Sequence, residues 1–251
     1  MKLHSIVKKA LMALTGLGLV GFLITHLTGN FLLYKGADKF DGYAHWLEEN
    51  PALPLAEMGL LGLFLFHIFL ALKLTLENNS ARPQKYEVRK TAGQSSLASR
   101  TMIISGLAIF GFVVLHIWQF KFGRALPTDS LWQLVISEFQ KPWVVGVYVV
   151  AMLLLGLHLS HGIASALQSL GLRDDSGRPR LKGLGPAIGW GMALLFALMP
   201  IWAFTAKPVK AQAYPPFKID IKEDIKVKTS QAGTLPDNAA QTKLAGSAHA
   251  E

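Results

Sequence analysis

Residues 11–34 read LMALTGLGLVGFLITHLTGNFLLY, an apolar run that contains no Asp, Glu, Lys or Arg. A helix needs about 20 such residues to cross a bilayer core about 30 Å thick. The run is too long for the hydrophobic region of a cleaved signal peptide, and it lacks a small-residue cleavage site. We therefore predict a transmembrane helix here, with His26 inside it.

Four further stretches have the same character, at residues 55–76, 101–122, 144–170 and 187–204. Of the whole chain, 51% is hydrophobic and 16% is charged, whereas a soluble domain is roughly 25% charged. Helices of a soluble bundle would show a polar stripe, which these stretches lack. The sequence predicts an all-α membrane protein, with a five-helix transmembrane domain over residues 1–205. Residues 206–251 are predicted to form an irregular extramembrane tail that is partly disordered, with strand-like alternation at 217–222.

The basic residues of the connecting segments predict the orientation. Thirteen of them lie before the first stretch, between the second and third, and between the fourth and fifth, with Lys73 at the end of the second stretch included. The other two connections hold five, with Lys121 at the end of the third stretch included. Because cytoplasmic loops carry the excess of Lys and Arg, we expect the N-terminus in the cytoplasm and the C-terminus outside. The net charge of +9 then reflects topology, and no pattern in the sequence favours nucleic-acid binding.

Histidine is the residue type on which a metal site in this chain would depend. The sequence has no cysteine, which excludes disulfides and thiolate-held clusters. Ionisable residues at membrane depth are costly and usually mark function. Five histidines fall within the apolar stretches: His26, His67, His116, His158 and His161. No internal repeat is strong enough to name.

The depths of four of these histidines form two layers. Successive spans alternate in direction, so His26 and His116 both lie towards the outside, and His67 and His158 both lie towards the inside. Two imidazoles from different helices are what a six-coordinate haem iron requires from the protein. The sequence therefore predicts two b haems, separated in depth by on the order of 10–15 Å. Nearby glycines either admit a flat macrocycle or are ordinary helix-packing positions: Gly29, Gly62, Gly111, Gly156 and Gly162.

The fourth ligand has a competitor, because His161 follows His158 by one helical turn. His161 is either the ligand itself or a hydrogen-bond partner of a haem propionate. Ser99 and Arg100 are two further candidates for propionate contacts on the cytoplasmic side.

The order of these features resembles a known family. The matching elements are the run from Lys8 to Gly16, His26-Leu-Thr-Gly-Asn30, His67-Ile-Phe69, His116, and the run from His158-Leu-Ser-His-Gly162 to Gly171. Over about residues 1–205 the chain resembles the five-helix, di-haem cytochrome b membrane anchor of succinate:quinone oxidoreductases (succinate dehydrogenases) and quinol:fumarate reductases. The long outer tail departs from the family pattern.

The resemblance implies specific roles. His26 and His116 would ligate an outer, low-potential haem, and His67 and His158 an inner, high-potential haem. A flavoprotein subunit and an iron–sulfur subunit would bind the cytoplasmic face in a bacterial inner membrane. Electrons would pass between them and a quinone, in this family usually menaquinone. The succinate-oxidising site would lie on the partner subunits, and the resemblance leaves the physiological direction of electron flow open.

A quinone gains or loses protons together with electrons, so its site needs a polar group near the membrane edge. Glu48, Glu49 and Glu57 lie around the first outer connection and are candidates for this proton handling. Their alternative role is as solvated or helix-capping side chains.

Three other functions remain open from the residues alone. A di-haem b subunit of a hydrogenase or formate dehydrogenase would have similar histidines. A metal or proton transporter could use membrane histidines, although no carboxylate lies in the middle of a span. The third possibility is a structural anchor without haem.

Overall fold

The computed structural model describes residues 5–80, 101–122, 130–172 and 183–206 of the chain. All regular secondary structure in these ranges is helical, and no strand occurs in them. The predicted tail from residue 207 onwards, with the strand-like segment at 217–222, lies outside the described residues.

Five of the described helices are long and apolar enough to cross a membrane. They are α1 (Ser5–Asn30), continued by a 3₁₀ turn (Phe31–Lys35); α3 (Leu53–Ser80); α5 (Met102–Ile117), continued by a π-helical turn (Trp118–Phe122); α7 (Pro142–Ser169); and α8 (Leu184–Thr205). Each overlaps one of the five stretches expected from the sequence, which confirms the all-α fold class.

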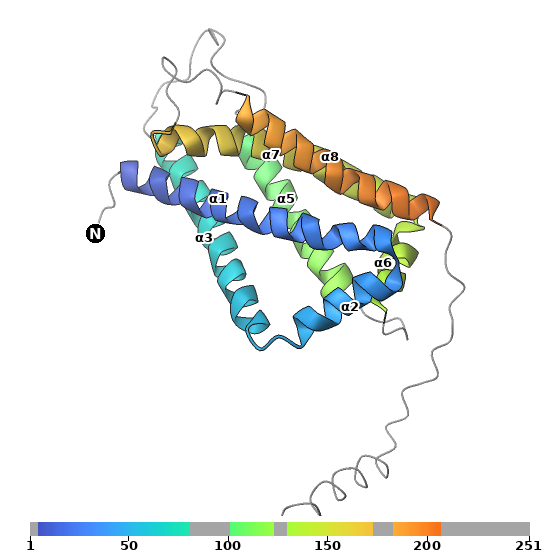
Figure 1. Cartoon of the computed structure of the whole chain (residues 1–251). Helices are drawn as coiled ribbons and strands as arrows, with labels where there is room; N and C mark the ends of the chain where they lie inside the picture. The colour runs from blue at the N-terminus through green and yellow to red at the C-terminus, as the bar shows by residue number, and fades with distance from the viewer. Residues whose placement is uncertain (1–4, 81–100, 123–129, 173–182, 207–251) are drawn as a thin grey trace, which may run out of the picture. The chain divides into compact units, whose positions relative to one another are not determined.

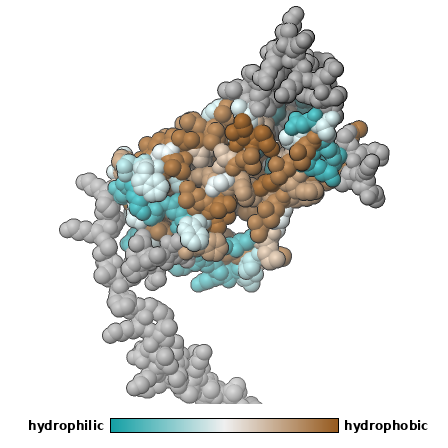
Figure 2. Space-filling model, turned by 180° about the vertical axis from the view of Figure 1, so that it is seen from behind, coloured by the Kyte–Doolittle hydropathy of each residue, from teal (hydrophilic) through white to brown (hydrophobic). Residues whose placement is uncertain are grey.

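Large apolar side chains cover the outside of this bundle. Leu55, Leu76 and Ile104 are 75%, 69% and 65% exposed, on two different helices. Figure 2 shows a broad hydrophobic band on one face, with hydrophilic residues towards its ends. Water would penalise so large an apolar surface, whereas lipid tails do not. The surface and the five apolar helices support a multi-pass membrane protein.

Two short helices that the sequence analysis did not predict lie at one end of the bundle. They are α2 (Ala37–Glu48) and α6 (Leu131–Phe139), and they contact each other (Figure 1). The chain enters α2 through Gly36, whose φ of 91° is a conformation that favours glycine. The carboxylate of Asp41 on α2 accepts hydrogen bonds from the Ser130 hydroxyl (2.6 Å) and the Trp132 backbone N–H (2.8 Å). One side chain thus attaches the start of α6 to α2.

The closest helix packing is between α7 and α8, which lie side by side (Figure 1). A Cβ added to Gly189 would lie 2.6 Å from the backbone nitrogen of Ser160, and one added to Gly185 would lie 2.6 Å from its carbonyl oxygen. Small residues four apart allow helix backbones in membranes to approach in this way. The arrangement makes α7 the most buried of the spans.

The remaining spans pack more loosely. α1 packs against both α3 and α7, and α5 packs against α7. α3 makes only a minor contact with α5. The candidate histidines lie on these four helices, and α8 carries none of them.

Candidate functional site

His26 on α1 and His116 on α5 are brought together by the fold. Their ring centroids are 5.9 Å apart, with an angle of 86° between the ring planes. A metal ion bonded to both imidazoles at about 2 Å on each side would place the ring centres about 6 Å apart. The separation therefore suits a metal ion shared by the two rings. The angle of 86° between the ring planes is compatible with this, because each imidazole can rotate about its bond to the metal.

His67 on α3 and His158 on α7 form the second predicted pair. Each of the two rings is half-buried. Each is held by a hydroxyl group from a neighbouring helix. Thr15 Oγ1 lies 3.1 Å from His67 Nδ1, and Ser105 Oγ lies 3.3 Å from His158 Nδ1.

The direction of these hydrogen bonds follows from the hydroxyl groups. Thr15 donates its only hydrogen to the carbonyl of Met12 at 3.1 Å, and Ser105 donates to the carbonyl of Met102 at 3.1 Å. Each hydroxyl must then accept from the histidine, so Nδ1 carries the proton. Nε2 keeps its lone pair, as a metal-ligating imidazole requires.

A glycine next to each hydroxyl residue makes room for the imidazole. A Cβ added to Gly16 would lie 3.2 Å from His67 Cε1, and one added to Gly106 would lie 3.3 Å from His158 Cε1. Larger side chains at these positions would press against the rings. The histidines therefore rest against the helix opposite, next to the residue that orients them.

His116 is oriented differently, by the phenol of Tyr148. His116 Nδ1 lies 3.1 Å from the Tyr148 hydroxyl, which donates to Gln119 Oε1 at 2.9 Å. Since the hydroxyl hydrogen is used in that bond, Tyr148 accepts from His116 Nδ1–H, and Nε2 is again free. The His26 ring stacks on Phe22 with the centroids 5.5 Å apart.

The structure reveals an internal repeat that the sequence analysis did not name. Met12, Thr15 and Gly16 on α1 correspond to Met102, Ser105 and Gly106 on α5, in each case 90 residues later. His26 and His116 share that offset, and His67 and His158 differ by 91. Each half of the chain therefore has one helix that carries a hydroxyl residue followed by a glycine, with a histidine ten residues beyond that glycine. The next span in each half carries a second histidine.

This repeat defines the distance between the two layers. On α1, Gly16 touches the His67 ring and His26 lies ten residues further along one continuous helix. On α5, Gly106 and His116 are related in the same way. At 1.5 Å per residue the layers are about 15 Å apart along the helices. The value lies at the upper end of the range expected from the sequence.

No three His, Asp or Glu side chains converge as a possible metal site within the described ranges. A structural or catalytic zinc site takes at least three ligands from the protein. Pairs of histidines suit a metal that brings its other ligands with it, as haem iron does. The donor set, the ring spacing and the free Nε2 atoms therefore fit haem.

His161 is half-buried and lies one turn beyond His158. The hydroxyl contact and the adjoining glycine belong to His158, which favours His158 as the ligand. Ser99 and Arg100 lie outside the described residues, so their proposed propionate contacts stay predictions.

The three glutamates lie at the α2 end of the bundle. Glu48 and Glu49 are exposed at the end of α2. Glu57 on α3 forms an ion pair with Lys121 of the π-helical turn. A proton-handling role for any of them stays a prediction.

Two of the glycines singled out from the sequence have a packing role. Gly29 lies against the Tyr43 ring, and Gly156 lies against Trp190 of α8. A Cβ on Gly62 or Gly111 would meet nothing within 4 Å. The glycines that contact histidine rings, Gly16 and Gly106, were not among the candidates. The repeated Met-x-x-Thr/Ser-Gly motif was the signal that could have identified them.

The chain is similar to a curated protein, the succinate dehydrogenase cytochrome b558 subunit of Bacillus subtilis (strain 168). The two are 23% identical over 156 residues, which cover 60% of this chain and 72% of the relative. The likeness supports the family inferred from the sequence. No protein-family model matches the chain, and no solved structure matches it.

Proposed function

We propose that this chain is the di-haem cytochrome b membrane anchor of a succinate:quinone oxidoreductase. His26 and His116 would hold one haem b, and His67 and His158 the other. The observation that carries the proposal is the geometry of these histidines: the His26 and His116 rings converge from two helices, and hydrogen bonds leave Nε2 free on at least three of the four. The relative in Bacillus subtilis favours succinate dehydrogenase over hydrogenase or formate dehydrogenase.

Bound haem supplies reversible one-electron transfer. Thr15, Ser105 and Tyr148 hold the ligating rings in one tautomer and orientation. The apolar spans exclude water from both layers. The two histidine pairs are about 15 Å apart along the helices, so both haem sites lie within the same helix bundle. In this role the chain conducts electrons between an iron–sulfur subunit on its cytoplasmic face and a membrane quinone, for which menaquinone is our candidate.

The remaining parts of the proposal concern the membrane and the quinone. The charge distribution supports a cytoplasmic N-terminus, an external C-terminus and, with the proposed partners, a bacterial inner membrane. The flavoprotein subunit carries the succinate chemistry, and the iron–sulfur subunit carries the clusters, because this chain has no cysteine to hold one. Glu48, Glu49 and Glu57 lie at the predicted outer end, where quinone protons would be exchanged.

The test is a reduced-minus-oxidised spectrum of the purified complex with haem quantitation. We expect about two b haems per chain, reducible by succinate. His26→Ala and His116→Ala should lose one haem, and His67→Ala and His158→Ala the other. His161→Ala, the matched control one turn from His158, should keep both. Absence of b-type bands refutes the proposal, and loss of the same haem in His26→Ala and His67→Ala refutes the assigned pairs.

A further inference from the structure

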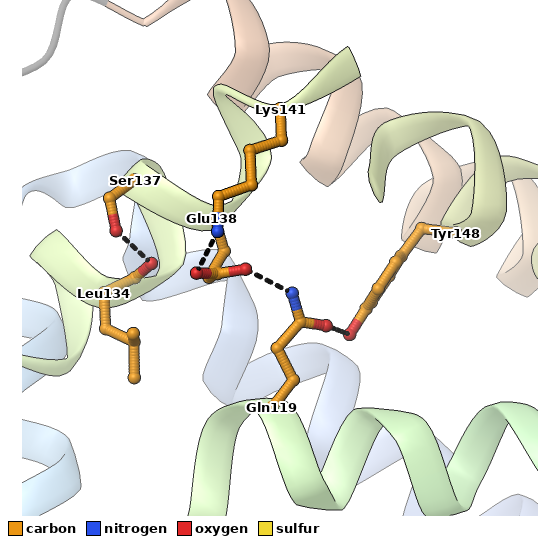
Figure 3. A network of polar contacts seen from close by, with 6 residues as sticks. All are labelled: Gln119, Leu134, Ser137, Glu138, Lys141 and Tyr148. Carbon is orange, nitrogen blue, oxygen red and sulfur yellow. Dashed lines mark hydrogen bonds and ion pairs between the residues drawn. The ribbon is translucent and has the colours of Figure 1, made fainter. Parts of the chain in front are cut away.

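A line of hydrogen bonds leads from His116 to the charged end of α6. His116 Nδ1 contacts Tyr148 (3.1 Å), Tyr148 contacts Gln119 (2.9 Å), Gln119 contacts Glu138 (2.7 Å), and Glu138 contacts Lys141 (2.7 Å). Figure 3 shows its members from Tyr148 to Lys141. We call these five residues the relay. They come from α5, the π-helical turn, α6, α7 and the residue that precedes α7.

Every bond of the relay has one direction. The Glu138 carboxylate accepts from the Gln119 amide nitrogen and from Lys141. The bond from Gln119 to Glu138 fixes the orientation of the Gln119 amide. Its oxygen therefore faces Tyr148 and accepts the phenolic hydrogen. Tyr148 is left as the acceptor for His116 Nδ1–H. The negative charge of Glu138 is therefore connected to the His116 imidazole by hydrogen bonds whose donors all point towards Glu138.

The relay passes through the protein interior. Tyr148 is 6% exposed, and the Glu138 side chain is 19% exposed. Lys141, at the far end, is 48% exposed. Hydrogen bonds to ionised groups are about twice as strong as neutral ones, and a low local dielectric strengthens them further. The charge of Glu138 is thus felt along the relay more than a surface charge would be.

In the described part of the chain, the other three candidate ligands are not connected to a carboxylate by hydrogen bonds. His67 and His158 donate to hydroxyl groups that end on the neutral carbonyls of Met12 and Met102. Within the described residues the structure shows no hydrogen bond to the His26 ring. His116 is therefore the one candidate ligand connected to a carboxylate in this part of the chain.

We infer that Glu138, acting through Gln119 and Tyr148, is a positioning residue that makes His116 the most electron-donating of the four imidazoles. An acceptor on the far nitrogen of a ligating histidine raises its basicity. A more basic ligand stabilises the oxidised state of a bound iron and lowers its reduction potential. This inference rests on the proposed function, and it concerns the site formed by His26 and His116.

The test is a redox titration of both haems in the complete membrane complex. Glu138→Gln removes the charge, and Tyr148→Phe removes the acceptor with little change in shape. Both should raise the potential of the haem that is lost in His116→Ala. Partners of metal ligands change metal affinity by about tenfold or more, and we expect a change of about tenfold in the reduction equilibrium of this haem, which is 59 mV for one electron. The other haem should not move.

Asp38→Asn is the matched control, because it removes an exposed carboxylate at the same end of the bundle, on α2. It should leave both potentials unchanged. A shift in Glu138→Gln no larger than that in Asp38→Asn overturns the inference. An equal shift of both haems overturns it as well, since the relay contacts one ligand.

A second measurement separates this inference from the proposed function. Nitrogen-15 spectra of labelled histidine in the full chain, prepared without haem, report which ring nitrogen of His116 carries the proton. Wild type should show the Nδ1–H form, and Tyr148→Phe should lose that preference. A His116 protonated at Nε2 in the wild type overturns the inference whether or not the chain binds haem.

Discussion

Replacing Thr15 by Val should weaken haem binding at the His67–His158 pair and leave the His26–His116 pair unaffected. Valine has nearly the shape of threonine, so the change removes the hydroxyl and little else. The lost contact is the 3.1 Å bond to His67 Nδ1. The carbonyl of Met12, the other partner of the hydroxyl, remains in the hydrogen-bond ladder of α1. The cost therefore falls on the histidine.

Two independent estimates of the free energy lost when His67 loses its hydroxyl partner agree with each other. A buried donor left without its acceptor costs about 1–3 kcal/mol. Loss of an outer partner of a metal ligand weakens metal binding about 10–100-fold, which is about 1.4–2.8 kcal/mol at 1.4 kcal/mol per tenfold. We expect a decrease of that size in the affinity of one haem.

The assay is transfer of haem from the purified chain to an excess of an apo-haem protein, followed by difference spectra that resolve the two haems. Thr75→Val is the matched control, since Thr75 on α3 donates to the carbonyl of Ala71 in the same way. The control should release both haems at the wild-type rate. If Thr15→Val behaves like Thr75→Val, or releases both haems equally, the hydroxyl of Thr15 does not orient His67 as argued.

Two further predictions concern the stability of the helix packing. Gly189→Val should lower the melting temperature in detergent, because its Cβ would lie 2.6 Å from the backbone of Ser160 and overpacking costs about 1–3 kcal/mol. Gly191→Val on the same helix is the control and should change the melting temperature little, because a Cβ there meets nothing within 4 Å. Equal effects of the two substitutions would count against close α7–α8 packing. Glu77→Gln should destabilise the chain by about 1 kcal/mol, since it leaves the buried Lys8 ammonium without its ion-pair partner. A melting temperature equal to that of the wild type would show that the Lys8–Glu77 ion pair contributes nothing to stability.

The long helices and the histidine pairs were predictable for a physical reason. A span of bilayer thickness must be continuous and apolar, which leaves a strong signal in one dimension. Alternating span direction then relates depth to sequence position, so His26 could be paired with His116 before any contact was known. The structure brings these two rings to 5.9 Å, although their role as ligands stays a prediction.

The short helices were missed because nine to twelve residues carry little periodic signal. A local signal was present for α6. Ser130 and Gln133 have the spacing of a capping box, and the Ser130 hydroxyl accepts from the Gln133 backbone N–H at 3.1 Å. The long-range anchor of this helix, Asp41, is 89 residues away from Ser130. Such a partner follows from tertiary packing and cannot be read from either segment alone.

The partners of the histidines were missed for a similar reason. Thr15 and Ser105 donate to carbonyls of their own helix, as any threonine or serine in a membrane helix does. Their second contact, to a histidine on another span, appears only when the helices are packed. The recurrence of Met-x-x-Thr/Ser-Gly after 90 residues is the feature of the sequence that marks them.

The repeat also has a consequence for the order of assembly. Each histidine pair takes one member from the first half of the chain and one from the second: α1 with α5, and α3 with α7. A nascent chain that has inserted α1 and α3 therefore has neither site complete. The His26–His116 site becomes available once α5 is in place, and the His67–His158 site only after α7 follows. On the proposed function, haem loading is a late event in biogenesis, and the two haems join halves of the bundle whose helices contact each other mainly through α1 and α7.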